Sequence, residues 1–182
     1  MQPAEPSAPS ALLVSRLPAL RDCARLGPIV DLGCGRGRHA RWLAAEGLPV
    51  IAIDRNRKAL RELAGEKDIR PVLADLESGH GIPLVSGSCG AILVFRFLFR
   101  PLAEAIEAAL APSGLLLYET FTRAQRSHGW GPKRDAFLLE QGELPRLFPG
   151  LEILHYDEGP APGSRTSRIS RISNRTPKLN PY

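Results

Sequence analysis

Three glycines and an aspartate stand at positions typical of a nucleotide site. Gly33, Gly35 and Gly37 alternate directly after the apolar stretch PIVDL, and Asp54 ends the next apolar stretch, VIAID. Glycines in such a turn allow positive φ and a close approach of the backbone, and the amides that open a following helix face the ligand. A carboxylate after the second strand can accept hydrogen bonds from both hydroxyls of a ribose. These residues predict a site for an adenosine-bearing ligand.

Asp31 separates two classes of cofactor. A dinucleotide site has the glycine pattern GxGxxG and places a pyrophosphate at the helix N-terminus. Here the pattern is GxGxG, and Asp31 stands two residues before its first glycine, where it would repel a phosphate. The carboxylate suits the ammonium of an amino-acid group instead. The alternative is a tight strand-to-helix turn without a ligand, but Asp54, Asp75 and the motif of the fifth strand together favour a cofactor site.

The elements that must position these residues alternate between strand and helix. Apolar runs predict strands, and amphipathic stretches that end at glycine predict helices between them. Strands are expected at 28–33, 48–54, 69–77, 90–99, 115–121 and 151–159, and helices at 37–47, 56–66 and 101–114. Such alternation favours a parallel sheet covered on both faces, with ligands beyond the carboxyl ends of its strands.

The remaining segments flank this unit. Residues 1–10, with three prolines, predict disorder, and Pro18 predicts a helix that begins near it within the apolar stretch 12–26. The segment 123–150 is too long for a connector and predicts a lid over the open edge. The stretch 166–175, within a basic tail over 164–182, predicts a last strand that pairs with the sixth, so that residues 11–182 form one domain.

Composition bounds the function classes. The chain has 182 residues, enough for one core, and its three cysteines and four histidines show neither disulfide nor metal-binding spacing. No segment predicts a signal peptide or a membrane span, so a cytoplasmic location is expected. The net charge of +5 comes wholly from the tail, which carries five cations and no acid. That tail could bind nucleic acid, but a solvated or edge-protecting strand is the commoner explanation of such a pattern.

Four motifs, in order, resemble those of class I S-adenosylmethionine-dependent methyltransferases. They are VDLGCGRGRHA, VIAIDRN, PVLADLE and ALAPSGLLLYETF, and the resemblance covers Val30 to Thr122. It is greatest to the small bacterial tellurite-resistance-type branch. The resemblance implies an α/β, doubly wound, Rossmann-like domain whose mostly parallel seven-stranded sheet has an antiparallel last strand. It implies S-adenosylmethionine as cofactor, and the spacing of the histidines and cysteines predicts no metal site.

The resemblance also implies a role for each motif residue. Asp31 and the three glycines would hold the methionine part of the cofactor, and Asp54 its ribose. The remaining contacts would come from the ends of later strands, with Arg55 flanking the adenine, Asp75 and Leu76 meeting its amino group and ring edge, and Phe95 and Arg96 bordering the sulfonium and the acceptor. Phe95 and Arg96 stand where enzymes that methylate amino groups often have Asp or Asn followed by prolines, which argues against amino-directed DNA methylation.

The methyl acceptor is predicted to be a small molecule, because the chain has no substantial extra domain for a macromolecule. Methyl transfer from a sulfonium is an in-line displacement that relies on alignment and needs no base for a soft anion. If the acceptor must lose a proton, Glu119, Tyr118 and His128 are candidate bases. Arg96, Arg100, Arg123 and Arg126 could recognise an acidic substrate or simply cover apolar surface, and Trp130 could stack on an acceptor or cover the pocket. Cys34 is interpreted as a packing residue, and His39 as a helix-surface or supporting residue.

Two other functions stay open at this point. An RNA or protein methyltransferase would use the basic tail and the lid as one positive surface. A non-catalytic module would bind the same cofactor but present a closed acceptor side.

Overall fold

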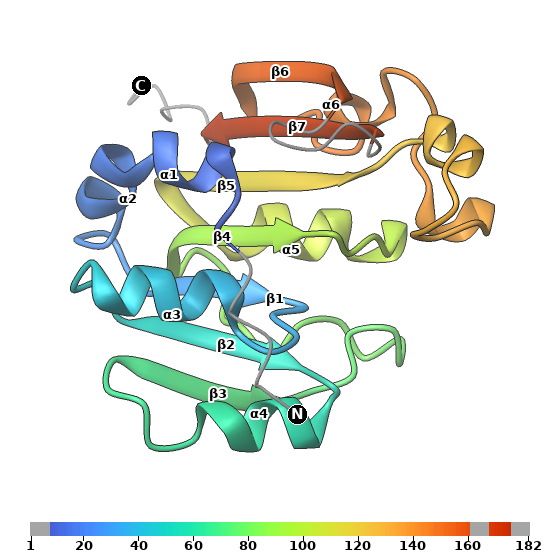
Figure 1. Ribbon diagram of the computed structural model, residues 1–182. Helices are drawn as coiled ribbons and strands as arrows, with labels where there is room; N and C mark the ends of the chain where they lie inside the picture. Colours follow the sequence, from blue (N-terminus) through green and yellow to red (C-terminus); the bar gives the residue numbers. More distant parts are fainter. Residues whose placement is uncertain (1–7, 161–167, 176–182) are drawn as a thin grey trace, which may run out of the picture.

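A computed structural model describes residues 8–160 and 168–175, and its centre is one seven-stranded sheet (Figure 1). The strand order is β3-β2-β1-β4-β5-β7-β6. The strands are β1 (Ile29–Leu32), β2 (Val50–Asp54), β3 (Ile69–Leu73), β4 (Cys89–Phe95), β5 (Leu110–Phe121), β6 (Glu152–Pro160) and β7 (Arg168–Arg175). Strands β1 to β5 pair in parallel, and β7 is antiparallel to both β5 and β6. The predicted α/β fold with an antiparallel last strand is therefore confirmed.

Helices cover both faces of the sheet because its central strands are apolar on both sides. Every residue of β4 is buried. One apolar cluster lies under α1 (Ala11–Ser15), α2 (Leu17–Cys23), α3 (Arg38–Ala45) and α4 (Arg57–Leu63). The other lies under η1 (Arg100–Leu102), α5 (Ala103–Ala109) and α6 (Glu143–Arg146). Two further 3-10 turns, η2 (Arg123–Ser127) and η3 (Asp135–Phe137), follow β5.

The register of the parallel strands brings several chain segments to one edge of the sheet. Leu32 at the end of β1 lies opposite Ile53 of β2 and Val94 of β4. The glycine turn, Asp54 and Phe95 therefore leave the sheet at the same edge. The strand order also reverses at this point of the sheet. From β1, the strands β2 and β3 extend to one side, whereas β4 and β5 extend to the other. Ligands of open α/β sheets bind at such points.

Two predictions about the flanking segments need correction. Strand β7 lies between β5 and β6, so it does not protect an edge; β6 is the edge strand. Residues 1–7 lie outside the described residues, but Ser10 is only 8% exposed, and its side chain caps α1 by accepting a hydrogen bond from Leu12 N. The predicted disorder therefore does not extend to Ser10.

The expected start of a helix near Pro18 is confirmed, since α1 ends before Arg16 and α2 has a proline in its first turn.

Among the described residues, no helix combines the length and apolar character that crossing a membrane requires.

Candidate functional site

The glycine turn between β1 and α3 adopts the backbone geometry that its sequence predicts. Gly33, Gly35 and Gly37 have φ of 69°, 55° and 75°, all in the left-handed region. The amides of Gly33 and Cys34 both donate to the carbonyl of Ile53, at 2.9 and 3.1 Å. The turn is thus held against the end of β2.

The three glycines are needed for different reasons. A Cβ at Gly37 would lie 2.5 Å from Cδ2 of Leu63, and one at Gly33 would lie 3.0 Å from the ring of Phe97. A Cβ at Gly35 would meet nothing within 4 Å. Gly37 therefore serves the packing of α3 on α4, whereas Gly35 borders open space at the edge of the sheet.

Alanine at these two glycines should consequently separate stability from binding. We expect Gly37→Ala to lower the free energy of unfolding by about 2–3 kcal/mol, because the new methyl overlaps buried Leu63 at a left-handed φ. Gly35→Ala should cost about 1 kcal/mol, from its φ alone, and should mainly weaken binding of an adenosyl ligand. Denaturant unfolding and titration with S-adenosylhomocysteine measure the two effects. Equal destabilisation by both changes would contradict this division.

Asp54 links the glycine turn to the start of α4. Its Oδ2 accepts a hydrogen bond from Gly35 N at 2.8 Å, and its Oδ1 accepts one from Asn56 N at 2.7 Å. Each carboxylate oxygen can accept a second hydrogen bond, so both remain able to receive a ribose hydroxyl. The carboxylate is therefore oriented by the backbone before any ligand arrives.

Beside Asp54 lies a pocket of about 150 Å³ that reaches from β2 across to β4. It is lined by Gly33, Asp54, Arg55, Ala74, Asp75, Leu76, Glu77, Arg96 and Phe97. Arg55 is exposed and donates to Glu77 at 2.6 Å, with Asp75 at 3.8 Å. Of the predicted cofactor residues, the structure brings Gly33, Asp54, Arg55, Asp75, Leu76 and Arg96 together in this one pocket.

Asp31 is the most unusual charge at this edge. It is 1% exposed, and burial raises the pKa of its carboxyl to about 7, against the opposing effects of Arg38 and the Ala40 amide. Its Oδ2 has no hydrogen-bond partner among the described residues. A buried carboxylate oxygen without a donor is costly. It fits an ammonium that would arrive with a ligand over the glycine turn.

Ser10 of the N-terminal segment forms a polar cluster with His39 and Glu119. Ser10 Oγ donates to Glu119 Oε2 at 2.7 Å, and Ser10 N donates to His39 Nε2 at 3.3 Å. The ring of His39 lies 4.0 Å, centroid to centroid, from that of Phe95. His39 is 4% exposed, and burial, with Arg38 and Arg96, lowers its pKa to about 3. His39 is thus not a helix-surface residue, and it stays neutral.

The candidate bases separate onto different faces. Glu119 joins the polar cluster, but its neighbour Tyr118 lies on the other face of β5, where its hydroxyl donates to Phe97 O at 3.1 Å. Burial raises the pKa of Tyr118 further above its ordinary value. His128 follows η2, and its Nε2 is buried without a hydrogen-bond partner among the described residues. Phe95 is buried and does not line the pocket at Asp54.

The predicted lid forms a folded unit beyond the end of β5. Leu138 packs on Phe121, Leu139 pairs with Thr122, and Trp130 meets Phe121 edge to face at 5.9 Å. None of its residues lines the pocket at Asp54.

Sequence reasoning did not find Ser10, Arg38 or Phe97. Serine directly before a helix is a capping signal, and that signal identifies Ser10. Arg38 lies within the glycine motif itself, and Phe97 lies two residues after the end of β4. Only the fold shows that Phe97 packs on Gly33.

Cys34 is a packing residue, as predicted. Its thiol donates weakly to Gly35 O at 3.7 Å, and burial, followed by Asp31 and Asp54, raises its pKa. A thiol held in its neutral form is a poor nucleophile. Among the described residues, no three His, Cys, Asp or Glu side chains gather in a way that could hold a metal ion.

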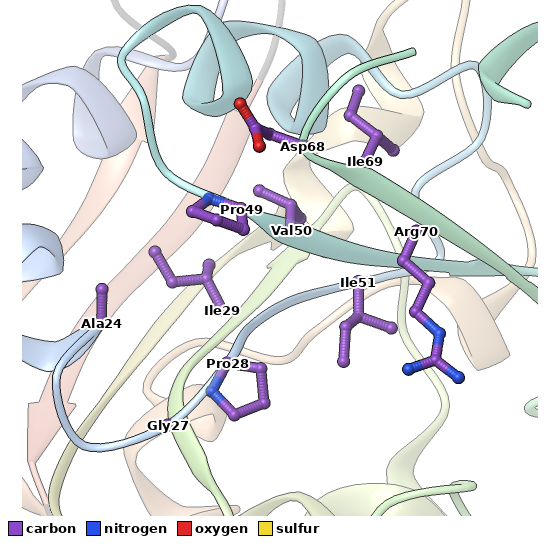
Figure 2. A pocket seen from close by; sticks show the side chains of 10 residues that line it. All are labelled: Ala24, Gly27, Pro28, Ile29, Pro49, Val50, Ile51, Asp68, Ile69 and Arg70. Carbon is purple, nitrogen blue, oxygen red and sulfur yellow. The ribbon is translucent and has the colours of Figure 1, made fainter. Parts of the chain in front are cut away.

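A second hollow of about 390 Å³ lies at the opposite, amino-terminal edge of β1, β2 and β3 (Figure 2). Its walls are mainly apolar, with Pro28, Ile29, Pro49 and Val50 gathered around it, and Asp68 and Arg70 contribute the charged groups. It contains no equivalent of Asp31 or of the glycine turn. The chemistry predicted from the sequence is therefore at the carboxyl edge.

Comparisons with known proteins agree with this geometry. Residues 29–114 match a family model described as a methyltransferase domain. No curated protein matches the sequence.

Three solved structures illustrate the likeness in fold. An S-adenosylmethionine-dependent methyltransferase from Mesorhizobium loti has a TM-score of 0.65 at 22% identity, over 88% of this chain and 97% of that one. One from Methanosarcina mazei gives 0.67 at 17% identity, over 88% and 98%. TehB from Haemophilus influenzae gives 0.65 at 17% identity, over 88% of this chain and 62% of TehB. Residues 29–114 therefore match a methyltransferase domain, and the fold around them is the one that these S-adenosylmethionine-dependent methyltransferases share.

Proposed function

We propose that the protein transfers a methyl group from S-adenosylmethionine to a small-molecule acceptor at the carboxyl edge of β1, β4 and β5. The observation that carries the cofactor part is the buried Oδ2 of Asp31, which has no hydrogen-bond partner among the described residues, together with the open space at Gly35. A ligand with an ammonium group would satisfy that oxygen. Asp54 and the part of the pocket at the ends of β2 and β3 provide for an adenosine.

Each lining residue would hold one part of the cofactor. Asp31 accepts from the ammonium, and the glycine turn lets the backbone approach the methionine part. Asp54, already oriented by Gly35 N, accepts from the ribose hydroxyls. Arg55, held by Glu77, covers the adenine, and Asp75 with buried Leu76 borders the ring. Phe95 and Arg96 lie at the end of β4, towards the acceptor.

S-adenosylmethionine supplies a methyl group on a sulfonium, and transfer to a nucleophile leaves S-adenosylhomocysteine. The chain's own contribution is to align the acceptor and to exclude water. The ring of Phe97, packed against the glycine turn, and the segment at Ser10 both cover this edge. Where the acceptor carries a proton, Glu119 is the candidate base best placed to receive it, because Tyr118 lies on the other face of β5.

A small acceptor fits the size and polarity of the described site. Within the segment 123–150, Arg123 and Arg126 pair with the segment's own Asp135 and Glu140, which leaves less free positive charge for a nucleic acid. Much of the basic tail lies outside the described residues, which keeps an RNA or protein acceptor as the second candidate. The free thiols suit the reducing cytoplasm that the sequence predicts.

The first test is calorimetric titration with S-adenosylmethionine, S-adenosylhomocysteine and, as control, NAD. We expect both adenosyl ligands to bind at micromolar concentration and NAD not to bind. Asp54→Ala should weaken binding by about 100-fold, because two charge-assisted hydrogen bonds to the ribose are lost. Asp22→Ala, which removes an exposed carboxylate from α2, is the matched control and should bind as the wild type does.

A folded protein that binds neither adenosyl ligand would contradict the proposal. If binding is confirmed, transfer of a radiolabelled methyl group to pooled small molecules or to pooled RNA decides between the acceptor classes. Binding without transfer to either pool would indicate the non-catalytic module.

A further inference from the structure

Three of the four arginines that could recognise an acidic substrate are engaged within the protein. Arg100 forms a two-point ion pair with Glu143, at 2.5 and 2.9 Å. Arg123 pairs with Glu140 at 3.0 Å and with Asp135 at 3.5 Å, and Arg126 also pairs with Asp135. These three arginines hold the segment 123–150 together. Of these four arginines, Arg96 alone has no ion pair within residues 8–160.

Arg96 occupies a backbone conformation that costs energy and places it at the site. It follows β4 with a φ of 57°, which residues other than glycine seldom adopt, and its amide donates to Glu119 O at 2.8 Å. Such strain persists where the surroundings enforce it, typically at functional sites. The side chain is exposed, lines the pocket with Gly33 and Phe97, and has no ion-pair partner among residues 8–160.

Arg38 is a second cation close enough to Arg96 to act on it electrostatically. It opens α3, and its Nη1 donates to Ala8 O at 3.3 Å. Burial and the charge of Arg96 lower the pKa of its guanidinium, and both arginines also lower the pKa of His39. The two cations thus lie within electrostatic reach of each other, and Glu119 and Asp31 are the acids that act on Arg38.

Those two acids do not neutralise the pair once a cofactor binds. Asp31 would then face the cofactor's ammonium, which leaves Glu119 as the single acid opposite the two arginines. The sulfonium adds a further positive charge at the point of transfer. An anion is the species that this field attracts.

We propose that Arg96, supported by Arg38, binds an acidic group of the methyl acceptor, so that the substrate is a small molecule with a carboxylate or another oxyanion near its nucleophile. This inference rests on the proposed function. It explains how the acceptor is oriented, because an arginine fork fixes the direction of a carboxylate. It also lessens the need for a base, because nearby cations favour the deprotonated nucleophile.

The experiment compares two small thiols that differ in one charge, mercaptoacetate and mercaptoacetamide, titrated into the protein saturated with S-adenosylhomocysteine. Ionic strength is held constant. We expect the acid to bind about 10-fold or more tightly than the amide, as one charge-assisted hydrogen bond implies. Arg96→Asn should remove this preference, because asparagine tolerates the left-handed backbone without carrying charge. Arg96→Lys should retain part of it, and Arg61→Asn on the exposed side of α4 should change nothing.

The carboxylate that Arg96 meets could also be the cofactor's own. Methylthioadenosine, which lacks the amino-acid part, distinguishes the two sources. If Arg96→Asn weakens S-adenosylhomocysteine binding about 10-fold, leaves methylthioadenosine binding unchanged, and the wild type shows no preference between the thiols, Arg96 binds the cofactor and the inference is overturned. A wild-type complex that binds S-adenosylhomocysteine but shows no preference for the acid overturns it as well. Failure of S-adenosylhomocysteine to bind at all removes the proposed function first.

Discussion

Replacing Asp31 by asparagine is expected to make the ligand-free protein more stable and to remove most of its affinity for the cofactor. The carboxyl is buried, and one of its oxygens has no hydrogen-bond partner among the described residues, so its charge is a cost that a cationic ligand would offset. The neutral amide avoids that cost but cannot pair with an ammonium. We expect S-adenosylhomocysteine to bind about 100-fold more weakly, as for loss of a buried charge-assisted contact.

The stabilisation should depend on pH with a defined sign. Folding raises the pKa of Asp31 from 3.8 to about 7, so the folded state favours the protonated form. Its contribution to stability is fully present below about pH 4 and is lost as the pH rises through 7. The advantage of Asp31→Asn should therefore be small at pH 4 and reach up to about 4 kcal/mol at pH 8. Denaturant unfolding of both proteins at the two pH values measures it.

The titration of His39 makes the stability of both proteins depend on pH in the direction opposite to that of Asp31. This contribution is the same in both proteins and cancels when they are compared. Its pKa falls from 6.5 to about 3 on folding, so its contribution is present above about pH 6.5 and is lost as the pH falls towards 3. Two results would contradict this account of Asp31: a gain in stability from Asp31→Asn that is the same at both pH values, or a variant that keeps its full affinity for the cofactor. In the wild type at pH 7, cofactor binding should release about half a proton, detectable calorimetrically in buffers of different ionisation enthalpy.

Replacing Arg100 by methionine is expected to open the segment 123–150. Arg100 lies at the start of η1 and donates to Glu143 and to the carbonyls of Ala136 and Leu138, at 3.1 and 2.9 Å for the carbonyls. Glu143 Oε2 in turn accepts from Glu140 N. Methionine keeps the apolar stem but leaves a half-buried carboxylate without its cation. We expect a loss of about 2–3 kcal/mol, below the range for a fully buried pair.

Proteolysis and hydrogen exchange locate the effect. Amides of residues 136–143 should exchange faster in Arg100→Met, while those of β1 and β4 should change little. Arg123→Met is the matched control, since its ion pairs are about half exposed and should contribute less than 1 kcal/mol. Because Arg100 lowers the pKa of Glu143, the pair stabilises the fold above the ordinary carboxyl range and weakens as acid protonates Glu143. Uniform loss of protection in both variants would contradict a local anchor.

The sequence predicts the order of elements because each local signal agrees with the fold. Glycine turns, buried β-branched runs and capped helices place β1 to β4 and α3 to α5 within a few residues. Strand β5 begins earlier than predicted, at Leu110, since tertiary pairing of Cys89 with Leu110 extends it. No local sequence pattern indicates that β7 lies between β5 and β6, because this position depends on which strand pairs with the edge of β5.

The site was predictable where a motif carries it and not where the fold assembles it. Asp31, Asp54 and the glycines lie within 24 residues of chain (31–54) and are recognisable by spacing. The contact between Ser10 and Glu119 joins residues 109 positions apart, which periodicity cannot indicate. The distinction between Arg96 and the engaged arginines likewise depends on partners such as Glu143, 43 positions from Arg100.

The anchoring of Ser10 on Glu119 has a practical consequence for anyone who labels or fuses this protein. The backbone at Ala8 is held by Arg38, and Ser10 reaches His39 and Glu119, so the chain runs over the site as it enters α1. A fluorophore attached just before Ala8 would report on events at the carboxyl edge of the sheet. A bulky affinity tag in the same place would crowd Ser10 and its contacts with His39 and Glu119, and should hinder access to the proposed site.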